Sequence, residues 1–299
     1  MARTICVCNQ KGGVGKTTSA VNLSSALALD GVRVLLVDLD PQANATGGLG
    51  VEKKSVERSI YHALLDGVSV AEIARETRIP NLDLVPSQVA LSGDEVELVG
   101  LPDREKRLRE ALRPVRERYD LILIDSPPSL GLLTVNALTA ADGVLIPMQC
   151  EYYALEGLSQ LLETVKRVES GLNPGLVIEG ILLTMADFRT RLTTDVIGEV
   201  RRFFGSKVYD AVIPRSVRLS EAPSRGLPIE LYDPTSAGAQ AYRVLARKLK
   251  ETLNARDEGV RERNTSADTG GEPAVAAGGA EGSAGGDPAE PVSAPEEPG

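Results

Sequence analysis

The chain has 299 residues, of which 42% are hydrophobic, and its formal net charge at pH 7 is −9. It has no tryptophan and only three phenylalanines, so its core must be built from aliphatic side chains, which suits an α/β protein. No segment approaches the roughly 20 apolar residues of a membrane span, and the N-terminal apolar run is too short for a secretory signal, which predicts a cytoplasmic protein.

Short β-branched segments alternate with longer helical patterns along the chain. The predicted strands are residues 4–8, 32–38, 82–85, 121–124, 143–147, 177–183 and 208–213. The predicted helices include residues 16–29, 105–118, 156–169 and 237–253. This alternation predicts βαβ units around a mostly parallel, twisted sheet flanked by helices. No linker divides residues 1–254, which predicts one domain.

The cysteines give no sign of a metal cluster or a disulfide framework, because they include no CxxC pair. Cys6 and Cys8 are two residues apart in the first predicted strand and should therefore lie on one face of it. Cys150 is isolated in the sequence. We expect all three to be small buried side chains.

Charge is distributed unevenly along the chain. Residues 255–299 carry 10 acidic and 3 basic side chains and contain no leucine, isoleucine or aromatic residue. This composition predicts a disordered acidic tail rich in glycine, proline and alanine. Residues 185–250 carry 12 basic and 7 acidic side chains, so the last third of the predicted domain is basic.

A glycine-rich loop, "CNQKGGVGKTT", follows the first predicted strand. Its glycines are Gly12, Gly13 and Gly15, whereas Gln10 stands where the usual P-loop pattern has its first glycine. Backbone N–H groups of such a loop, with the helix that follows, can hold phosphates. Lys16 can reach the β- and γ-phosphates, and the Thr17 hydroxyl can bind Mg²⁺. The alternative, a strand-to-helix turn without a ligand, is disfavoured by the adjoining "GKTT".

Three aspartates follow two other predicted strands. Asp38 and Asp40 come from "VDLDPQ", and Asp125 ends the apolar run of "YDLILIDSPP". A single aspartate here could be only a turn or helix-cap residue. Together with the glycine loop, however, the three predict a nucleotide and metal site at the carboxyl ends of the strands.

The sequence resembles the ParA (Soj) family of chromosome and plasmid partitioning ATPases, which has a deviant Walker A motif. The matching segments are "NQKGGVGKTTSAVNLSSALA", "VLLVDLDPQANAT", "YDLILIDSPPSLGLLTVNAL", "VIPRSVRLSEAPSRGLPI" and "YDPTSAGAQAY". The resemblance implies a P-loop NTPase domain that binds ATP and Mg²⁺ and forms an ATP-dependent homodimer. It also implies binding to double-stranded DNA without sequence preference, nucleoid association, and hydrolysis stimulated by a ParB-type centromere-binding protein.

Lys11 is the unusual second lysine of the loop. Two neighbouring ammonium groups repel each other unless phosphate charge lies between them, so Lys11 is expected to point away from Lys16. By resemblance, Lys11 crosses the dimer interface to the phosphates of the other subunit, where it neutralises charge. The alternative is a solvated loop lysine.

The resemblance also implies roles for the other site residues. Asp40 orients the attacking water or accepts its proton, while Asp38 and Asp125 act through the Mg²⁺ hydration shell and Thr17 binds the metal. Pro214 and Ser216 match the loop that contacts adenine. The implied nucleotide-binding residues are Lys11, Gly12, Gly13, Val14, Gly15, Lys16, Thr17, Thr18, Pro214 and Ser216.

The basic segment is a candidate DNA-binding surface. Arg189 and Arg218 match family positions implicated in DNA binding. Other basic residues that could track phosphates are Arg191, Arg215, Arg225, Arg243, Arg247, Lys248 and Lys250. On the last predicted helix these could equally form a solvated face. We expect no aromatic residues among them, which disfavours binding to single strands.

Other functions fit the sequence less well. A MinD-like, membrane-associated regulator of cell division shares the ATP site but needs an amphipathic C-terminal helix, whereas the tail here is polar. A nitrogenase-type reductase would need paired cysteines. A P-loop ligase would need a second substrate pocket, and no segment of the sequence indicates one.

Overall fold

The structure is a computed structural model that describes residues 1–88, 97–151 and 158–268. It divides into two compact units, Met1–Ala255 and Arg256–Gly299. The first unit contains one eight-stranded sheet, with strand order β3-β4-β2-β5-β1-β6-β7-β8. The strands are β1 (Arg3–Val7), β2 (Val34–Asp38), β3 (Arg75–Glu76), β4 (Leu82–Val85), β5 (Leu121–Asp125), β6 (Gly143–Gln149), β7 (Val177–Ala186) and β8 (Val208–Pro214). All neighbours pair in parallel except β3 and β4, which are antiparallel.

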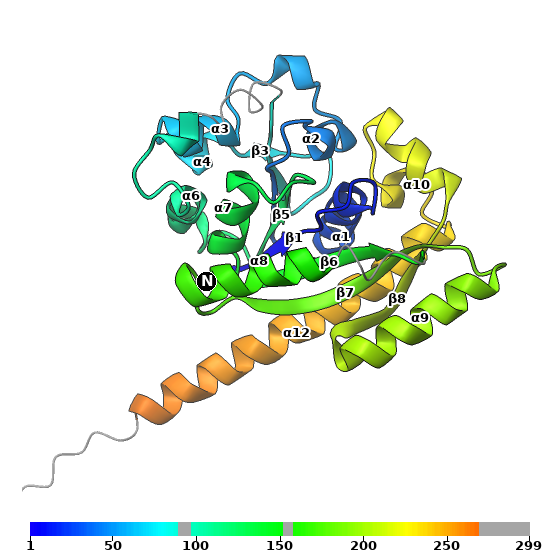
Figure 1. Ribbon diagram of the computed structural model, residues 1–299. Coiled ribbons are helices and arrows are strands. Elements are labelled where there is room, and N and C mark those ends of the chain that lie inside the picture. The colour runs from blue at the N-terminus through cyan, green and yellow to red at the C-terminus, as the bar shows by residue number, and fades with distance from the viewer. Residues whose placement is uncertain (89–96, 152–157, 269–299) are drawn as a thin grey trace, which may run out of the picture. The chain divides into compact units, whose positions relative to one another are not determined.

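Helices cover both faces of this sheet (Figure 1). One face packs against α1 (Lys16–Leu29), α11 (Ile229–Tyr232) and α12 (Ala237–Asp268). The other packs against α3 (Ile60–Leu65), α4 (Val70–Ile73), α6 (Arg107–Leu112), α7 (Leu132–Ala140), α8 (Leu158–Gly171) and α9 (Arg191–Phe204). The shorter elements are α2 (Asn44–Gly48), α10 (Val217–Glu221), η1 (Lys53–Ser55), η2 (Arg113–Val115), η4 (Gly205–Lys207) and η5 (Ala222–Arg225).

The side chains of β1 alternate between two hydrophobic cores. Ile5 and Val7 face the core under α1 and α12, whereas Cys6 and Cys8 face the other core. The prediction that the two cysteines share a face is therefore confirmed, and all three cysteines are free and buried. Because both faces are covered, the central strands are apolar throughout, as parallel strands usually are.

Helix α1 is buried along most of its length and is rich in alanine and serine. These small residues let it approach the sheet on one side and α12 on the other. The buried serine hydroxyls form hydrogen bonds within the fold. The Ser24 hydroxyl donates to the carbonyl of Ala20 at 2.7 Å, and the Ser19 hydroxyl lies 3.1 Å from that of Tyr242 in α12. The helix that begins at the glycine loop is therefore fixed firmly.

The predicted α/β fold with a mostly parallel sheet is confirmed, and α1 has the predicted bounds. The antiparallel edge strand β3 was not predicted. The helix predicted for residues 105–118 is shorter, because Pro114 lacks a backbone N–H and the chain continues as η2. Helix α8 begins at Leu158, and residues 156–157 of the predicted helix lie outside the described residues.

The C-terminal region differs from the prediction at its boundary. Helix α12 continues to Asp268, so it runs past Ala255, where the sequence predicts that the disordered tail begins. This part of the sequence is polar, and its arginines and glutamates favour a helical conformation. Residues 269–299 of the predicted tail lie outside the described residues.

Two glycines bring α2 and η5 into close contact. Gly50, just after α2, and Gly226, at the end of η5, both have positive φ angles, of 82° and 62°. A Cβ atom on Gly226 would lie 2.6 Å from the Cα of Gly50, which no side chain tolerates. This packing holds the segment after β2 against the segment after β8.

Candidate functional site

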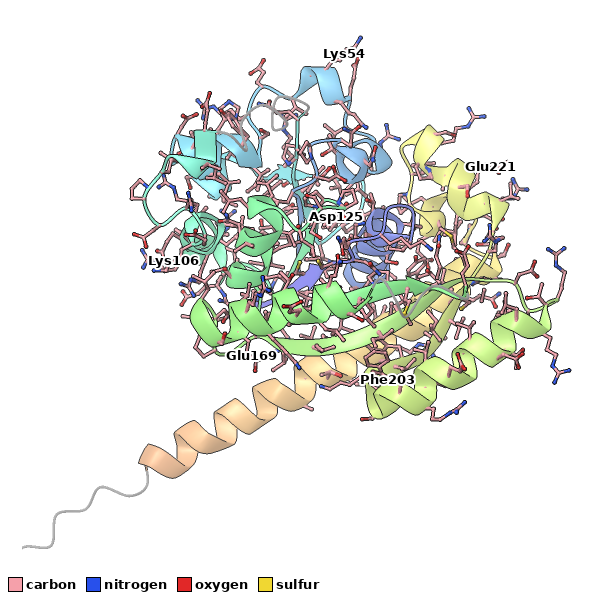
Figure 2. All side chains as sticks on the ribbon, in the orientation of Figure 1. Lys54, Lys106, Asp125, Glu169, Phe203 and Glu221 are labelled. Atoms are coloured by element: carbon pink, nitrogen blue, oxygen red, sulfur yellow. The ribbon has the colours of Figure 1, made fainter. Side chains whose placement is uncertain are left out.

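The candidate site lies at the carboxyl ends of the central strands. Val7 at the end of β1 and Asp38 at the end of β2 are both in register with Asp125, the last residue of β5. The glycine loop leaves β1 at this level and leads into α1 (Figure 1). Figure 2 labels Asp125 at this position in the middle of the molecule. The predicted loop and acidic residues are therefore brought together.

The glycine loop is held in place by residues of β6 and β7 and by its own Asn9. The Asn9 side-chain amide donates to the carbonyl of Pro147 at 2.7 Å. The Gln149 amide donates to the carbonyl of Gly13 at 2.9 Å, and the Thr184 hydroxyl donates to that of Val14 at the same distance. These bonds direct the carbonyls of Gly13 and Val14 toward the body of the protein. No sequence motif marks Gln149 and Thr184, which lie more than 130 residues away along the chain.

Lys16 lies beneath the loop and is almost entirely buried. Its ammonium group donates to the carbonyl of Lys11 at 3.2 Å. Burial lowers the pKa of Lys16, while the charges of Asp125, Cys8 and Asp40 raise it. A buried ammonium with one neutral acceptor has unused capacity to bind an anion.

Asp125 is fully buried, and neither of its carboxylate oxygens has a hydrogen-bond partner among the described residues. Burial raises the pKa of Asp125 well above its usual range, and the neighbouring carboxylate of Asp38 raises it further. The nearby Thr17 hydroxyl and Lys16 ammonium lower the pKa of Asp125 in part. The Thr17 hydroxyl is not placed to form a hydrogen bond with the Asp125 carboxylate. A buried acid without a partner is costly, and it indicates a position that a cationic ligand completes.

Asp38 and Asp40 have different surroundings. One Asp38 oxygen accepts hydrogen bonds from both the backbone N–H and the hydroxyl of Thr46, each at 2.7 Å. The Thr46 hydroxyl in turn accepts from the backbone N–H of Ser87 at 3.0 Å. Burial raises the pKa of Asp38 to about 6, although the bonds from Thr46 oppose this. Asp40 is also buried and accepts a hydrogen bond from the N–H of Gln42 at 2.9 Å. Thr46 ends the matching segment "VLLVDLDPQANAT", but the sequence assigned no role to it.

Lys11 is directed differently from Lys16. Its side chain is 44% exposed, and its ammonium lies 3.2 Å from a carboxylate oxygen of Glu151. The other oxygen of Glu151 lies 3.6 Å from the guanidinium of Arg215. The expected outward direction of Lys11 thus agrees with the geometry, but Glu151 was not predicted as its partner.

A cavity of about 310 Å³ adjoins the glycine loop. Its wall includes Gly15 and Thr18 on the loop side, Pro214 at the end of β8 and Ser216 just after it. Its remaining lining residues are Thr184, Met185, Ile213, Arg215, Leu219, Ser220, Pro223 and Tyr242. The structure therefore places Pro214 and Ser216 beside the loop, as the sequence predicts. Met185 was not predicted; it has a φ angle of +53°, uncommon for a non-glycine residue, and its sulfur accepts from Gln149 at 3.1 Å.

Arg189 and Arg218 are exposed, and each is paired with carboxylates. Arg189 forms two hydrogen bonds with Asp187, at 2.8 and 2.6 Å, which lower the pKa of Asp187 to about 2. Arg218 lies 3.2 Å from Glu221 and 3.5 Å from Asp233. The two arginines follow the neighbouring strands β7 and β8, which pair at their ends.

The other predicted basic residues fall into two groups. Arg191 and Arg215 share the β7 and β8 ends, and Arg225 lies on η5 nearby in sequence. On α12, by contrast, Arg243 and Lys250 form ion pairs within the fold, with Glu230 and Asp30 respectively. The expectation that no aromatic residue is interleaved with the arginines is wrong, because Phe188 directly precedes Arg189 and is 63% exposed.

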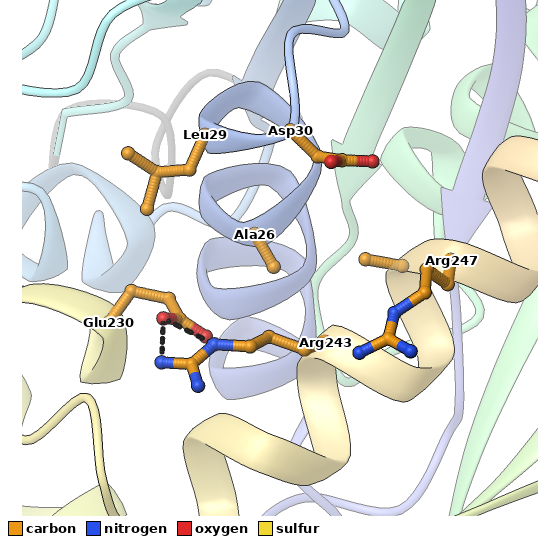
Figure 3. Close-up of a pocket in the computed structure, with 7 residues that line it drawn as sticks. Ala26, Leu29, Asp30, Glu230, Arg243 and Arg247 are labelled. Carbon is orange, nitrogen blue, oxygen red and sulfur yellow. Dashed lines mark hydrogen bonds and ion pairs between the residues drawn. The ribbon is translucent and has the colours of Figure 1, made fainter.

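A second cavity, of about 280 Å³, lies between α1, α11 and α12 (Figure 3). It adjoins Leu29 and Asp30 at the far end of α1 from the glycine loop. Figure 3 shows Arg243 bound to Glu230 across this cavity, and the two are 2.7 Å apart. Because this pair links α11 to α12, we assign these residues a structural role.

Comparison with known proteins identifies the family. Residues 2–178 match the family described as AAA domain. The chain is 59% identical over 249 residues to the sporulation initiation inhibitor protein Soj of Bacillus subtilis, covering 83% of this chain and 98% of that protein. It is 55% identical over 249 residues to the chromosome partitioning protein ParA of Myxococcus xanthus, covering 83% and 88%. The chain therefore belongs to the Soj/ParA family of chromosome-partitioning P-loop ATPases.

Solved structures share the fold. Cobyrinic acid a,c-diamide synthase from Mycobacterium smegmatis, with bound ADP and magnesium, matches with a TM-score of 0.75 at 37% identity, covering 85% of this chain and 96% of that one. The septum site-determining protein MinD from Pyrococcus horikoshii, complexed with Mg-ADP, matches with a TM-score of 0.68 at 28% identity, covering 83% and 96%. Within the described residues, no helix is long and apolar enough to cross a membrane.

Proposed function

We propose that this protein is an ATP-dependent DNA-partitioning ATPase that binds ATP and Mg²⁺ at the glycine loop. The observation that carries the proposal is the presence of Lys16 and Asp125 together at the loop: both are buried, and the carboxylate accepts no hydrogen bond from the described residues. The membership of the Soj/ParA family and the Mg-ADP bound to structural relatives support the same assignment.

The loop residues would bind and orient the phosphates. Gly12 and Gly13 have open space where a Cβ atom would project, so phosphates can approach the backbone N–H groups closely. Lys16 would exchange the Lys11 carbonyl for phosphate oxygens. The adenine would enter the cavity beside Pro214 and Ser216, whose apolar walls, Ile213 and Leu219, suit a planar base.

The acidic residues fit a Mg²⁺ ion. Thr17 offers a hydroxyl and Asp125 an unpartnered carboxylate, both oxygen ligands of the kind that Mg²⁺ prefers. Asp38, fixed by Thr46, would bind through water. When bound, Mg²⁺ neutralises phosphate charge. Asp40 would orient the attacking water and accept its proton, because one of its carboxylate oxygens accepts no hydrogen bond from the described residues.

Lys11 would act across the interface of an ATP-dependent homodimer. Its side chain is 44% exposed, and among the described residues a single exposed ion pair, with Glu151, holds its ammonium. Exposed pairs of this kind contribute little, about 0–1 kcal/mol, so phosphate charge from a second subunit could displace Glu151. Lys11 would then neutralise the charge that develops on the transferred phosphoryl group.

The arginines at the ends of β7 and β8 would bind the phosphates of double-stranded DNA without sequence preference. Dimerisation would double the number of phosphates contacted, and affinity rises steeply with that number. A ParB-type partner would stimulate hydrolysis and so release the protein from DNA.

Phosphate release, light scattering and DNA binding by the full-length chain test this proposal. With ATP and Mg²⁺ we expect hydrolysis, a dimer, and binding to random duplexes, whereas ADP should give a monomer and weak binding. Arg218→Glu should still dimerise but lose DNA binding. Arg167→Glu, a matched reversal of an exposed, ion-paired arginine on α8, should bind normally. Equal DNA affinity with ATP and ADP would refute the coupling.

A MinD-like role in cell division is the second candidate, because a MinD structure shares the fold. Membrane association by an amphipathic helix requires an apolar face. Beyond Ala255, the residues of α12 are almost all polar, with Val260 the largest apolar side chain. Vesicles of anionic lipid should therefore fail to sediment the ATP-bound protein, whereas co-sedimentation would favour the MinD-like role.

A further inference from the structure

We propose that Phe188, Leu192 and Val217 form an apolar wedge that enters the minor groove of double-stranded DNA between the arginine–phosphate contacts. The inference rests on the proposed DNA binding and adds a second kind of contact to it. Phe188 is 63% exposed, Leu192 47% and Val217 72%. Other large apolar side chains of the domain are exposed as well, and these three are distinguished by their place next to arginines beside the ends of β7 and β8.

The three residues belong to one part of the fold. Ala186 at the end of β7 pairs with Pro214 at the end of β8, and the N–H of Arg215 donates to the carbonyl of Ala186 at 3.0 Å. Phe188 lies in the segment that leaves β7, and Val217 begins α10, just after β8. Leu192 is the second residue of α9, next to the same segment.

The wedge residues alternate in sequence with arginines. Arg189 follows Phe188, Arg191 precedes Leu192, and Arg218 follows Val217. A protein-binding surface usually has a contiguous apolar centre from which charges are depleted, which is the opposite arrangement. Apolar wedges flanked by arginines are characteristic of proteins that bind the minor groove. This alternation favours DNA as the occupant.

The ion pairs of these arginines explain why an apolar contact would be needed. Arg189 is bound by Asp187, and Arg218 by Glu221 and Asp233. Phosphates must compete with these carboxylates, so each contact contributes less than a free arginine would. An apolar contact with bases is not screened by salt and would supply affinity that the paired arginines do not.

One aromatic side chain also argues for a groove contact instead of a single-stranded platform. Proteins that bind single strands stack successive bases on several aromatic residues. Near the ends of β7 and β8, Phe188 is the largely exposed aromatic residue among those described, whereas Tyr232 is half-buried and its hydroxyl donates to Glu221. A single wedge suits insertion at one base step of a duplex.

The test compares Phe188→Ala with the parent chain in binding to a random duplex, with ATP, across a series of salt concentrations. We expect affinity to fall about fivefold to a hundredfold at every salt concentration, the range for one lost aromatic–base contact. The slope of log affinity against log salt should not change, because no phosphate contact is lost. Arg189→Ala should instead reduce that slope by about 0.9.

Phe203→Ala is the matched control. Phe203 is 73% exposed and lies at the other end of α9, where Figure 2 labels it. Its removal should leave DNA affinity and slope unchanged. Phe188→Leu should recover most of the lost affinity, because leucine is also found as a wedge.

A short duplex with a fluorophore at each end tests insertion directly. The parent should shorten the end-to-end distance, since a wedge kinks the duplex by roughly 20–90°, and Phe188→Ala should not. Equal affinity and bending for Phe188→Ala and the parent would refute the wedge, as would an equal loss on single-stranded DNA. Loss of binding to a ParB-type protein, with DNA binding intact, would assign these residues to a protein interface. Failure of the parent itself to bind DNA would instead refute the proposed function.

Discussion

Charged side chains are buried at the ends of the central strands but exposed at the ends of β7 and β8. At the central strands, Lys16 and Asp125 are buried, and Asp125 has no hydrogen-bond partner among the described residues. At β7 and β8, the Arg189 side chain is 87% exposed and already paired with Asp187. A ligand therefore completes the first region, whereas in the second it must compete with partners that are already present.

This difference sets the kind of recognition that each region can provide. Buried groups in fixed positions accept only a ligand of matching shape and charge, and salt screens them little. Exposed arginines that exchange one anion for another accept any phosphate backbone and are sensitive to salt. The contrast suits the proposed function, in which the nucleotide is selected strictly and DNA is bound without sequence preference.

Removal of the Lys16 charge should have the largest effect. Lys16→Ala should weaken ATP binding by about a hundredfold to several thousandfold, because the phosphates would lose the buried ammonium that pairs with them. Nucleotide titration by calorimetry measures this, with the exposed lysine substitution Lys54→Ala as the control. Unchanged ATP affinity would remove Lys16 from the phosphate site.

Lys11→Ala should separate binding from turnover. The variant should bind ATP as a monomer but hydrolyse it about a thousandfold more slowly, because a charge supplied from a second subunit contributes at least that much in related phosphoryl transfers. Light scattering and phosphate release would detect the two effects. A variant that dimerises and hydrolyses like the parent would contradict the assigned role.

Asp40→Ala should bind ATP and form the dimer, yet hydrolyse ATP about a hundredfold more slowly, as is usual when a general base is lost. The complex with DNA should then persist after ATP is added. Single-turnover phosphate release measures the rate. Parent-like turnover would transfer the role to another residue.

Asp125→Asn should stabilise the nucleotide-free protein while weakening Mg²⁺-dependent binding of ATP. Removing a buried carboxylate without a partner should raise the free energy of unfolding by about 1 kcal/mol or more. Urea unfolding without nucleotide gives this value, and ATP titration with and without Mg²⁺ gives the second effect. A destabilised variant would show that the carboxylate has a partner after all.

The smallest effect concerns the exposed ion pairs. Glu221→Gln removes one carboxylate from Arg218 and should strengthen DNA binding by about twofold to fivefold at low salt, the value of an exposed pair. Glu163→Gln, which frees Arg167 on α8, is the matched control. Weaker DNA binding by Glu221→Gln would mean that the pair positions Arg218 for DNA.

The sequence predicted the fold best where local patterns are strong. Helix α1 was predicted with its observed bounds, because the glycine loop and the apolar residues fix its start and its burial. The two-residue strand β3 was missed, since its conformation depends on pairing with β4 and not on its own residues. The end of the long C-terminal helix was also missed, because composition indicates disorder more readily than a polar helix.

The site was predicted only as far as motifs reach. Lys16, Asp38 and Asp125 follow strands in recognisable segments, and register brings them together. Gln149 has no motif, because its role comes from a contact with a distant part of the chain, and the role of Thr46 depends on the direction of its hydroxyl, which the motif does not specify. Phe188 was visible in the sequence, but only the structure reveals that its ring is exposed.

The contact between Gly50 and Gly226 has a mechanical consequence. It joins the segment that follows Asp40 to the segment that follows Arg218, with no side chain between them to absorb a displacement. If ATP draws the first segment toward the phosphates, the second must move with it or open a gap at this point. The direct backbone contact between these two glycines would thus couple movement at the edge of the hydrolytic site to movement at the edge of the arginine surface.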